Sequence, residues 1–182
     1  MTFDSVALER GGRRLFEGMS FALGAGEALQ VAGPNGAGKS SLIRLAAGLL
    51  APAAGRVERP ARMALADDRP ALDRDLPLGR ALAFWSDAAR AAAALDAVGL
   101  GTLHAVPVRL LSSGQARRAA LARVIAADAP LWLLDEPLNA LDAASEALVE
   151  AAIARHRAAG GAVLAASHQA LAGDWRRLEL GA

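Results

Sequence analysis

Apolar residues recur along this chain with two different periods, and these periods predict alternating strands and helices. Alternating apolar positions near residues 6–8 and 21–23 predict two short strands, and glycine pairs between them mark turns. Short apolar runs predict buried strands over 28–32, 131–134 and 162–166. Residues 178–180 predict one edge strand, so predicted strands are spread along the whole sequence.

Helical spacing fills most of the segments between these strands. Apolar residues three and four positions apart predict helices over 40–49, 80–98, 113–127 and 145–158. Residues 53–82 are rich in proline, arginine and aspartate, and we expect them to be irregular. The alternation after residue 28 predicts an α/β fold with a mostly parallel sheet flanked by helices, and the strand-rich start adds a small antiparallel part.

The composition limits the class of protein. At 182 residues the chain suits one domain. Hydrophobic residues make up 54% of it, yet no apolar run approaches the length of about 18 that spans a bilayer. No signal peptide is recognisable, so we expect a soluble protein on the cytoplasmic side. The net charge of +1 gives no support to nucleic-acid binding, and the absence of cysteine excludes disulfides and thiolate metal sites.

A glycine-rich loop after the predicted strand 28–32 carries the first chemical signal. It fits the pattern G-x-x-x-x-G-K-[ST] in full, and its residues are Gly33, Pro34, Asn35, Gly36, Ala37, Gly38, Lys39, Ser40 and the following Ser41. Glycines let backbone N–H groups turn inward around phosphate oxygens, and the next helix offers its positive end to the same anion. We expect Lys39 to reach the β- and γ-phosphates of ATP and the Ser40 hydroxyl to join a Mg²⁺ shell. The alternative is a glycine-rich turn that only caps a helix.

The composition singles out the same loop. Of the 20 basic residues, Lys39 is the one lysine, and all the others are arginines. The slim ammonium group of lysine suits a phosphate loop, for which the planar fork of arginine is not equivalent. A lysine kept against this bias therefore supports a phosphate-binding role.

Two carboxylates follow the predicted strand 131–134. The carboxyl ends of parallel strands open beside the phosphate loop, so Asp135 is placed to hold Mg²⁺ and Glu136 to polarise an attacking water as a general base. Taken alone, an apolar run that ends in Asp-Glu is equally typical of a strand that leads into a solvated loop. Downstream of a complete phosphate loop, the functional interpretation is favoured.

The segment before the predicted helix 113–127 supplies a third signal. In isolation it is typical of an N-cap, and its residues are Leu111, Ser112, Ser113, Gly114 and Gln115. In order, the chain has the phosphate loop, this segment, the acidic pair, a loop over 139–142 and a histidine at 168. This order resembles the ABC ATPase family, in which the segment is the signature, and the resemblance covers nearly the full chain.

The resemblance implies a head-to-tail dimer that encloses ATP between two subunits. The signature of one subunit would act in trans on the γ-phosphate bound by Lys39 of the other. Asp142, in the D-loop, would connect the two sites across the interface. His168 would contact the γ-phosphate and orient the water that Glu136 activates, so Glu136 and His168 are the expected catalytic residues. A lone histidine after a strand is usually structural, and His168 is singled out only as part of the set.

The chain departs from the family pattern at three positions. A glutamine normally begins the segment that couples to the membrane partner, but Arg69 occupies that position, and Asp68 and Arg69 are the candidates to replace it. The aromatic residue that usually stacks on adenine is replaced by Arg10, which either stacks through its guanidinium plane or is a plain surface charge. Ser113 stands in place of one of the two signature glycines.

Wider stretches are similar to the ATPases of heme exporters in cytochrome c maturation. They lie over 13–21, 106–110, 129–135, 160–161 and 167–171. This similarity implies a peripheral ATP-hydrolysing motor on the cytoplasmic face of the inner membrane. Its partners would be integral membrane subunits of the same complex, heme-handling proteins among them. The candidate docking residues are Leu78, Phe84 and Trp85, although Phe84 and Trp85 would equally fill a small core.

These signals predict how the single domain is divided. We expect an antiparallel β part over 1–32, a phosphate-loop core over 33–69 and 116–182, and a reduced helical subdomain with the signature over 70–115. Other functional classes stay open at this point. They are the ATPase of another small ABC transporter, a soluble ABC ATPase that acts on DNA or ribosomes, a nucleotide-sensing module with poor turnover, and a P-loop kinase.

Overall fold

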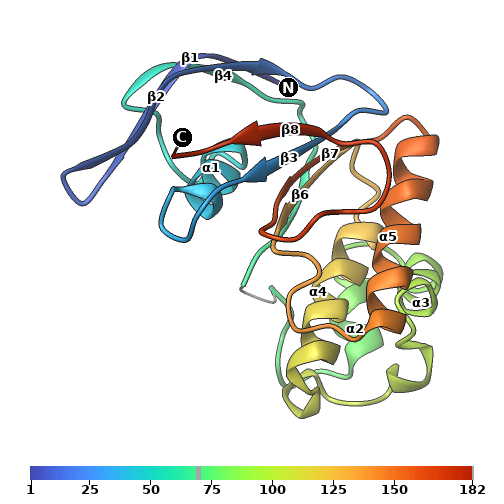
Figure 1. Ribbon diagram of the computed structural model, residues 1–182. Coiled ribbons are helices and arrows are strands. Elements are labelled where there is room, and N and C mark those ends of the chain that lie inside the picture. The colour runs from blue at the N-terminus through green and yellow to red at the C-terminus, as the bar shows by residue number, and fades with distance from the viewer. Residues whose placement is uncertain (69–70, 182) are drawn as a thin grey trace.

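Two sheets form the frame of the computed structural model, which describes residues 1–68 and 71–181. Among these residues, the antiparallel sheet has three strands, which are β1 (Thr2–Arg10), β2 (Arg13–Ala22) and β4 (Ala54–Glu58). In the same part of the chain the parallel sheet has five, which are β3 (Ala28–Ala32), β5 (Ala64–Ala66), β6 (Leu131–Asp135), β7 (Ala162–Ala166) and β8 (Arg176–Glu179). The strand orders are β2-β1-β4 and β5-β6-β7-β3-β8 (Figure 1).

The central strands β3, β6 and β7 are buried at every position, because both faces of the parallel sheet are covered. Successive residues of β6 point to opposite faces. Leu131 and Leu133 enter one core cluster, and Trp132 and Leu134 enter the other. Helix α1 (Lys39–Ala46) packs in the first cluster together with Phe3 of β1, on the side that faces the antiparallel sheet (Figure 1). The predicted α/β fold with an antiparallel addition is confirmed.

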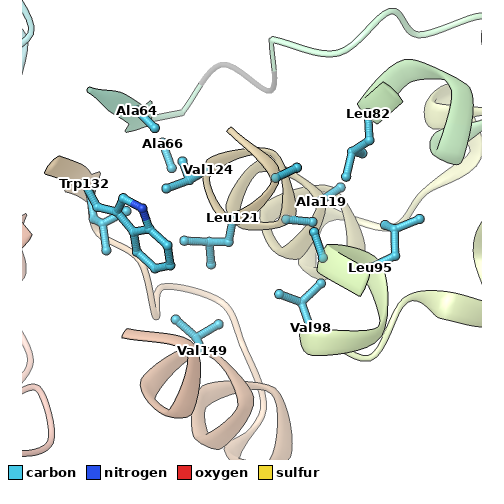
Figure 2. Packing of buried hydrophobic residues seen from close by; sticks show 14 of the residues in the cluster. Ala64, Ala66, Leu82, Leu95, Val98, Ala119, Leu121, Val124, Trp132 and Val149 are labelled. Carbon is cyan, nitrogen blue, oxygen red and sulfur yellow. The ribbon is translucent and has the colours of Figure 1, made fainter. Parts of the chain in front are cut away.

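The remaining helices lie on the side of the second face of the parallel sheet. They are α2 (Leu78–Ala83), α3 (Ala88–Ala97), α4 (Ser113–Ala126) and α5 (Ala143–Ala158), with short 3₁₀ turns η1 (Gly101–Leu103) and η2 (Val108–Leu110). Figure 2 shows Trp132 reaching toward Leu121 of α4 and Val149 of α5, while Leu95 of α3 packs on the opposite side of α4. The indole also stacks on His156, with ring centroids 3.9 Å apart. Within the described ranges, none of the helices has the length and apolarity of a membrane-spanning segment.

The expectation that residues 53–82 are irregular is wrong. This stretch contains β4, β5 and most of α2. β4 lies at the edge of the antiparallel sheet and is largely exposed, so it is held by pairing with β1 and has no apolar alternation of its own. β5 is a strand of 3 residues that pairs with β6, which is too short to leave a recognisable pattern.

Three further expectations are corrected. The helix predicted over 80–98 is two helices, and Asp87 begins the second by accepting a hydrogen bond of 2.9 Å from the backbone N–H of Arg90. The stretch 1–32 is not antiparallel throughout, because β3 is a strand of the parallel sheet. Leu78, a candidate docking residue, is fully buried among the helices. The division of the domain near residues 69 and 116 stays a prediction.

Candidate active site

The glycine-rich loop joins β3 to α1 at the carboxyl edge of the parallel sheet. Its backbone depends on glycine at three positions, because Gly33, Gly36 and Gly38 have φ angles of 139°, 83° and 105°. A side chain on Gly33 would collide with the backbone oxygen of Leu180, which follows β8. The loop therefore keeps its shape only because these positions lack a Cβ, and α1 begins directly behind it at Lys39.

Lys39 is held inside this loop. Its side chain is buried, with 7% of the residue exposed, and its Nζ donates hydrogen bonds to the carbonyl oxygens of Gly33 at 2.8 Å and Pro34 at 3.2 Å. Carbonyl oxygens carry only partial charge, so they satisfy the donors of the ammonium group without neutralising it. An anionic phosphate oxygen would be a stronger partner for the same group.

Ser40 and Asp135 meet at the next position along the site. The Ser40 hydroxyl donates to Oδ1 of Asp135 at 3.0 Å, and Asp135 is the last residue of β6. Burial raises the pKa of Asp135, the nearby charge of Glu136 raises it further, and the hydrogen bond from Ser40 opposes both effects. The two side chains offer the hydroxyl and carboxylate oxygens that Mg²⁺ prefers, so the donor set fits this ion.

Glu136 and His168 form a direct pair at the tips of neighbouring strands. β6 and β7 pair in register with Asp135 opposite Ala166, which brings Glu136 and His168 to the same edge. Oε2 of Glu136 lies 2.8 Å from Nδ1 of His168 and accepts a weaker bond of 3.4 Å from the backbone N–H of His168. Glu136 has a φ of 51°, a left-handed conformation that is costly for a side chain of this size and is typical of functional sites.

These groups line one open pocket of about 830 Å³. Its walls come from the glycine-rich loop, from the tips of β6 and β7, and from the hairpin between β1 and β2. The lining residues are Arg10, Leu15, Gly33, Pro34, Asn35, Gly36, Gly38, Lys39, Ser40, Ser41, Glu136, Asn139 and His168. The structure thus brings together nearly the whole predicted loop and both predicted catalytic residues. Of the loop, Ala37 is absent from the lining, and Asp135 lies behind Ser40.

The signature segment lies outside this pocket. Ser112 is the N-cap of α4, where its hydroxyl accepts from the backbone N–H of Gln115 at 3.3 Å and Oε1 of Gln115 accepts from the backbone N–H of Ser112 at 2.9 Å. Leu111 packs against the core, and Ser113 lines a neighbouring pocket with Asn139. Gly114 follows near the backbone of the 139–142 loop. Within one chain, the segment does not reach the phosphate loop.

Asp142 also lies outside the pocket. It is the N-cap of α5, and its Oδ1 accepts a hydrogen bond of 2.8 Å from the backbone N–H of Ser145. The hydrogen bond with Ser145 lowers the pKa of Asp142, so the side chain is an acceptor at neutral pH. This local role was not predicted, although an aspartate three residues before a serine in a helix start is a recognisable capping pattern.

The candidates for the missing glutamine are only partly described. Arg69 lies outside the described residues. Asp68 is bound by Arg44 of α1 at 2.9 Å, and Arg44 also lies 3.9 Å from Asp67. Three residues of the pocket, Arg10, Leu15 and Asn139, were not among the predicted site residues, although Arg10 was named as either a stacking residue or a surface charge. The departure from the aromatic pattern at Arg10 was the available signal.

Comparisons with known proteins assign this chain to a family. The family model described as ABC transporter matches residues 16–139. A cytochrome c biogenesis ATP-binding export protein from Sphingopyxis alaskensis is 60% identical and covers 94% of this chain and 91% of its own length. A protein of the same name from Novosphingobium aromaticivorans is 56% identical, with 92% and 87% covered. The chain belongs to the ABC transporter family.

Solved structures of ABC transporters share the fold. An ATP-binding subunit of an ABC transporter superposes with a TM-score of 0.81 at 22% identity, covering 92% of this chain and 78% of that one. A bacterial Atm1-family ABC exporter with ATP bound superposes with a TM-score of 0.85 at 24% identity, covering 98% and 36%. The predicted resemblance to ABC ATPases, and within them to the cytochrome c maturation proteins, is confirmed. As an ABC ATPase the chain binds ATP and couples its hydrolysis to transport.

Proposed function

We propose that the chain is the motor subunit of a membrane complex that delivers or exports heme during c-type cytochrome biogenesis. The names of its relatives support the pathway, since they are cytochrome c biogenesis ATP-binding export proteins. The observation that carries the motor role is the pair of Glu136 and His168, which are 2.8 Å apart at the strand tips beside the phosphate loop. A pocket that only sensed nucleotide would not need this pair.

Lys39 and the loop amides would bind the phosphates. The ammonium group now bonds to two carbonyl oxygens at 2.8 and 3.2 Å, and it would exchange these partners for oxygens of the β- and γ-phosphates. The amides at the N-terminus of α1 would add backbone donors and the positive end of the helix dipole. Binding would thus be electrostatic and would depend on this buried cation.

Ser40 and Asp135 would hold Mg²⁺, since their oxygens lie 3.0 Å apart at the inner wall of the pocket. When bound, the ion supplies positive charge that neutralises the β- and γ-phosphate oxygens. Before that, the hydroxyl of Ser40 keeps Asp135 oriented and donates to a carboxylate whose burial disfavours its charge. A cation bound beside Asp135 would stabilise its carboxylate and so lower the pKa that burial raises.

Glu136 and His168 would orient the attacking water. Glu136 is mostly buried, with 22% of its side chain exposed, while His168 is exposed at 51%. The imidazole fixes one carboxylate oxygen of Glu136, which leaves the other free to accept a hydrogen bond from water as a general base. His168 would then turn its outer ring nitrogen toward the γ-phosphate, so that positioning and charge provide the catalysis.

A head-to-tail dimer would complete the site. The capping box fixes Ser112 and Gln115 at the start of α4, outside the chain's own pocket. The exposed amides and hydroxyls at this helix start are suited to an anion, and a second copy would offer them the γ-phosphate of its own ATP. Asp142, held as the N-cap of α5, would lie at the dimer interface and connect the two ATP sites.

The membrane subunits would dock on the helical part, at the groove between residues 71–76 and α2. Phe84 is 82% exposed and Trp85 is 41% exposed, so Phe84 does not fill a core as the alternative supposed. Trp85 is fixed in place, because its Nε1 donates to the oxygen of Ala71 at 3.0 Å and the guanidinium of Arg123 lies 4.9 Å from its ring. The apolar groove beside them, which also includes Leu72, suits a short amphipathic segment of a membrane protein on the cytoplasmic face.

The first test replaces Glu136 by glutamine in the complete membrane complex. We expect Glu136→Gln to reduce ATP turnover by about 100-fold or more while ATP affinity changes by less than about threefold. In cells that depend on this subunit, the variant should fail to restore covalently bound heme in c-type cytochromes. Normal cytochrome c formation by a variant without turnover would overturn the motor role.

The second test concerns docking. We expect Phe84→Ser to lower the recovery of the membrane subunits with the chain by about tenfold, because an exposed aromatic at an interface often acts as a hot spot. Leu49→Ser is the matched control, since Leu49 is 62% exposed, follows α1 and does not line the groove. Equal loss in both variants would contradict the proposed surface.

A further inference from the structure

One polar side chain is buried at the centre of β3. This strand is apolar except for Gln30, and only 5% of that residue is exposed. A buried amide costs free energy unless its hydrogen bonds are made, and an apolar side chain would fill the same place without that cost. The partners of Gln30 therefore indicate its role.

Gln30 bonds to the loop that carries His168. Its Nε2 donates to the carbonyl oxygen of Gln169 at 2.7 Å and to that of Ser167 at 3.3 Å. These two carbonyls belong to the residues on either side of His168. One side chain thus holds both ends of a segment, 167–169, that has a predicted catalytic residue at its centre.

The backbone pairing of β7 with β3 ends just before His168. Its last pair is Ala166 with Val31, and one further bond of 3.2 Å joins the N–H of Ser167 to the oxygen of Val31. Beyond this point the contact with β3 continues through the side chain of Gln30. The Ser167 hydroxyl supplies a second donor to the Gln169 oxygen, at 2.9 Å.

The 167–169 segment decides where the imidazole of His168 lies. Nδ1 of His168 is 2.8 Å from Oε2 of Glu136, and its backbone N–H bonds to the same oxygen at 3.4 Å. The side chain of His168 is 51% exposed, so its position depends on the backbone of the segment more than on packing. Gln30 also lies three residues before Gly33, in the strand that leads into the phosphate loop. It therefore joins that strand to the histidine.

We propose that Gln30 is a positioning residue, which holds the 167–169 segment so that His168 keeps the geometry needed for ATP hydrolysis. An amide suits this place because its two N–H donors match two carbonyl acceptors. An apolar side chain or a carboxylate would leave both carbonyls without these donors. A displacement of about 1 Å at a reacting group can lower the rate on the order of 100-fold, so a bond outside the pocket can control turnover. The inference rests on the role proposed for His168.

The test is a double-mutant cycle in the complete membrane complex. Gln30→Met keeps the length of the side chain but removes both donors, and we expect it to lower kcat by about tenfold while the Kd of ATP changes by less than about threefold. In the background of His168→Ala, the same substitution should lower kcat by less than about twofold, because the histidine that Gln30 positions is gone. Equal losses in both backgrounds would overturn the proposal and make Gln30 a purely structural residue. An unchanged kcat in Gln30→Met would overturn it as well.

Leu29→Val is the matched control for lost packing in β3. Leu29 is buried in the same strand, and its side chain points to the opposite face of the sheet. We expect a lower unfolding midpoint with a kcat within about twofold of the unchanged protein. A loss of kcat as large as that in Gln30→Met would overturn the proposal.

Ser167→Ala tests the same segment from outside β3. It removes the second donor to the Gln169 oxygen and should lower kcat by about threefold. If Gln30→Met did not fold, this variant would decide, and an unchanged kcat would then overturn the positioning of the segment.

The imidazole signals of the full chain give a readout that does not depend on turnover. The chain has 3 histidines, and His104 and His156 lie outside the pocket, so they serve as internal references. In Gln30→Met we expect the ring resonances of His168 to shift and broaden in two-dimensional NMR spectra, while those of the other two stay in place. Unmoved His168 resonances would overturn the proposal. If His168→Ala alone left turnover unchanged, the proposed role of His168 would fail, and these resonances would still decide whether Gln30 positions the segment.

Discussion

The two sheets of this protein hold opposite ends of the same pocket and do so in different ways. In the parallel sheet, β3, β6 and β7 are buried at every position, and their tips carry the phosphate loop, Glu136 and His168. Along β2, which lies wholly in the described part of the chain, no residue is fully buried, and the hairpin it forms with β1 carries Arg10. The wall with the predicted catalytic residues is therefore built on a buried sheet, and the wall with Arg10 on an exposed hairpin.

This difference explains which groups of the site are fixed. Lys39 is buried and bonded to two carbonyl oxygens, and Glu136 is tied to His168 at 2.8 Å. Arg10 keeps a single bond of 3.4 Å. Positioning of reacting groups requires tolerances of a fraction of an ångström, and a buried frame supplies them. We therefore predict that substitutions in the parallel sheet lower stability and activity more than equivalent substitutions in the antiparallel sheet.

The largest expected difference is in stability. Leu133 of β6 is fully buried, and we expect Leu133→Ala to lower the free energy of unfolding by about 3–4 kcal/mol through lost burial and a residual cavity. Met19 of β2 is only partly buried, and Met19→Ala should cost less than about 1 kcal/mol. Urea unfolding followed by circular dichroism measures both. Equal losses would mean that the two sheets do not differ as described.

The next largest effect is expected for a substitution of Lys39 that conserves its charge. Lys39→Arg keeps the positive charge, but the planar fork needs space that a residue with 7% exposure does not have. We expect ATP affinity to fall by about 100-fold, measured by calorimetry, with an unfolding midpoint close to that of the unchanged protein. An affinity loss below about fivefold would show that the loop accepts either cationic side chain. ATP affinity would then depend on the positive charge more than on the space around it.

The parallel sheet was predictable from sequence because each of its central strands is a short, largely apolar run. A strand with one face in water would instead alternate apolar and polar residues. Leu131 to Leu134 and the run over 162–166 are buried on both faces, so their hydrophobicity does not depend on their partners. The phosphate loop and the acidic pair follow these strands directly. The recognisable strands therefore support the assignment of the motifs that follow them, and the motifs support the assignment of the strands.

The missed features depend on partners that are distant in sequence. β5 exists because Ala64 to Ala66 pair with β6, and β4 because it pairs with β1. The stack of Trp132 on His156 joins a strand to the end of α5 and leaves no periodic signal. Arg10 reaches the pocket only through the hairpin turn. Sequence patterns record local burial well, but they do not record which exposed side chain faces a site on another segment.

A smaller effect concerns the cap of α4. Ser112→Ala removes the acceptor of the Gln115 N–H and should lower the free energy of unfolding by about 1 kcal/mol. Ser112→Gly should cost only a few tenths of that, because glycine tolerates the cap conformation. Both variants would lose the hydroxyl proposed to act in trans, so both should lose ATP turnover in the dimer. A variant with normal turnover would contradict the role in trans and leave only the cap.

The smallest effect is a dependence of stability on pH at the tip of β6. Burial raises the pKa of Asp135, so the folded chain keeps this proton to a higher pH than the unfolded chain, in which the pKa is about 3.9. The favourable contribution is complete below that unfolded value and is lost as the pH rises through the raised folded value. Asparagine is neutral throughout, so Asp135→Asn should unfold at a higher temperature than the unchanged protein at pH 7, without nucleotide.

This advantage of Asp135→Asn should shrink as the pH falls and the folded Asp135 takes up its proton. Asp4→Asn, at an exposed position of β1 in the other sheet, is the control and should show no such trend. Thermal unfolding from pH 4 to pH 7 measures both. The gain should coincide with loss of ATP turnover, because the carboxylate that destabilises the empty fold is the one expected to hold Mg²⁺. A variant that is less stable at pH 7 would show instead that the bond from Ser40 outweighs the cost of burying the charge.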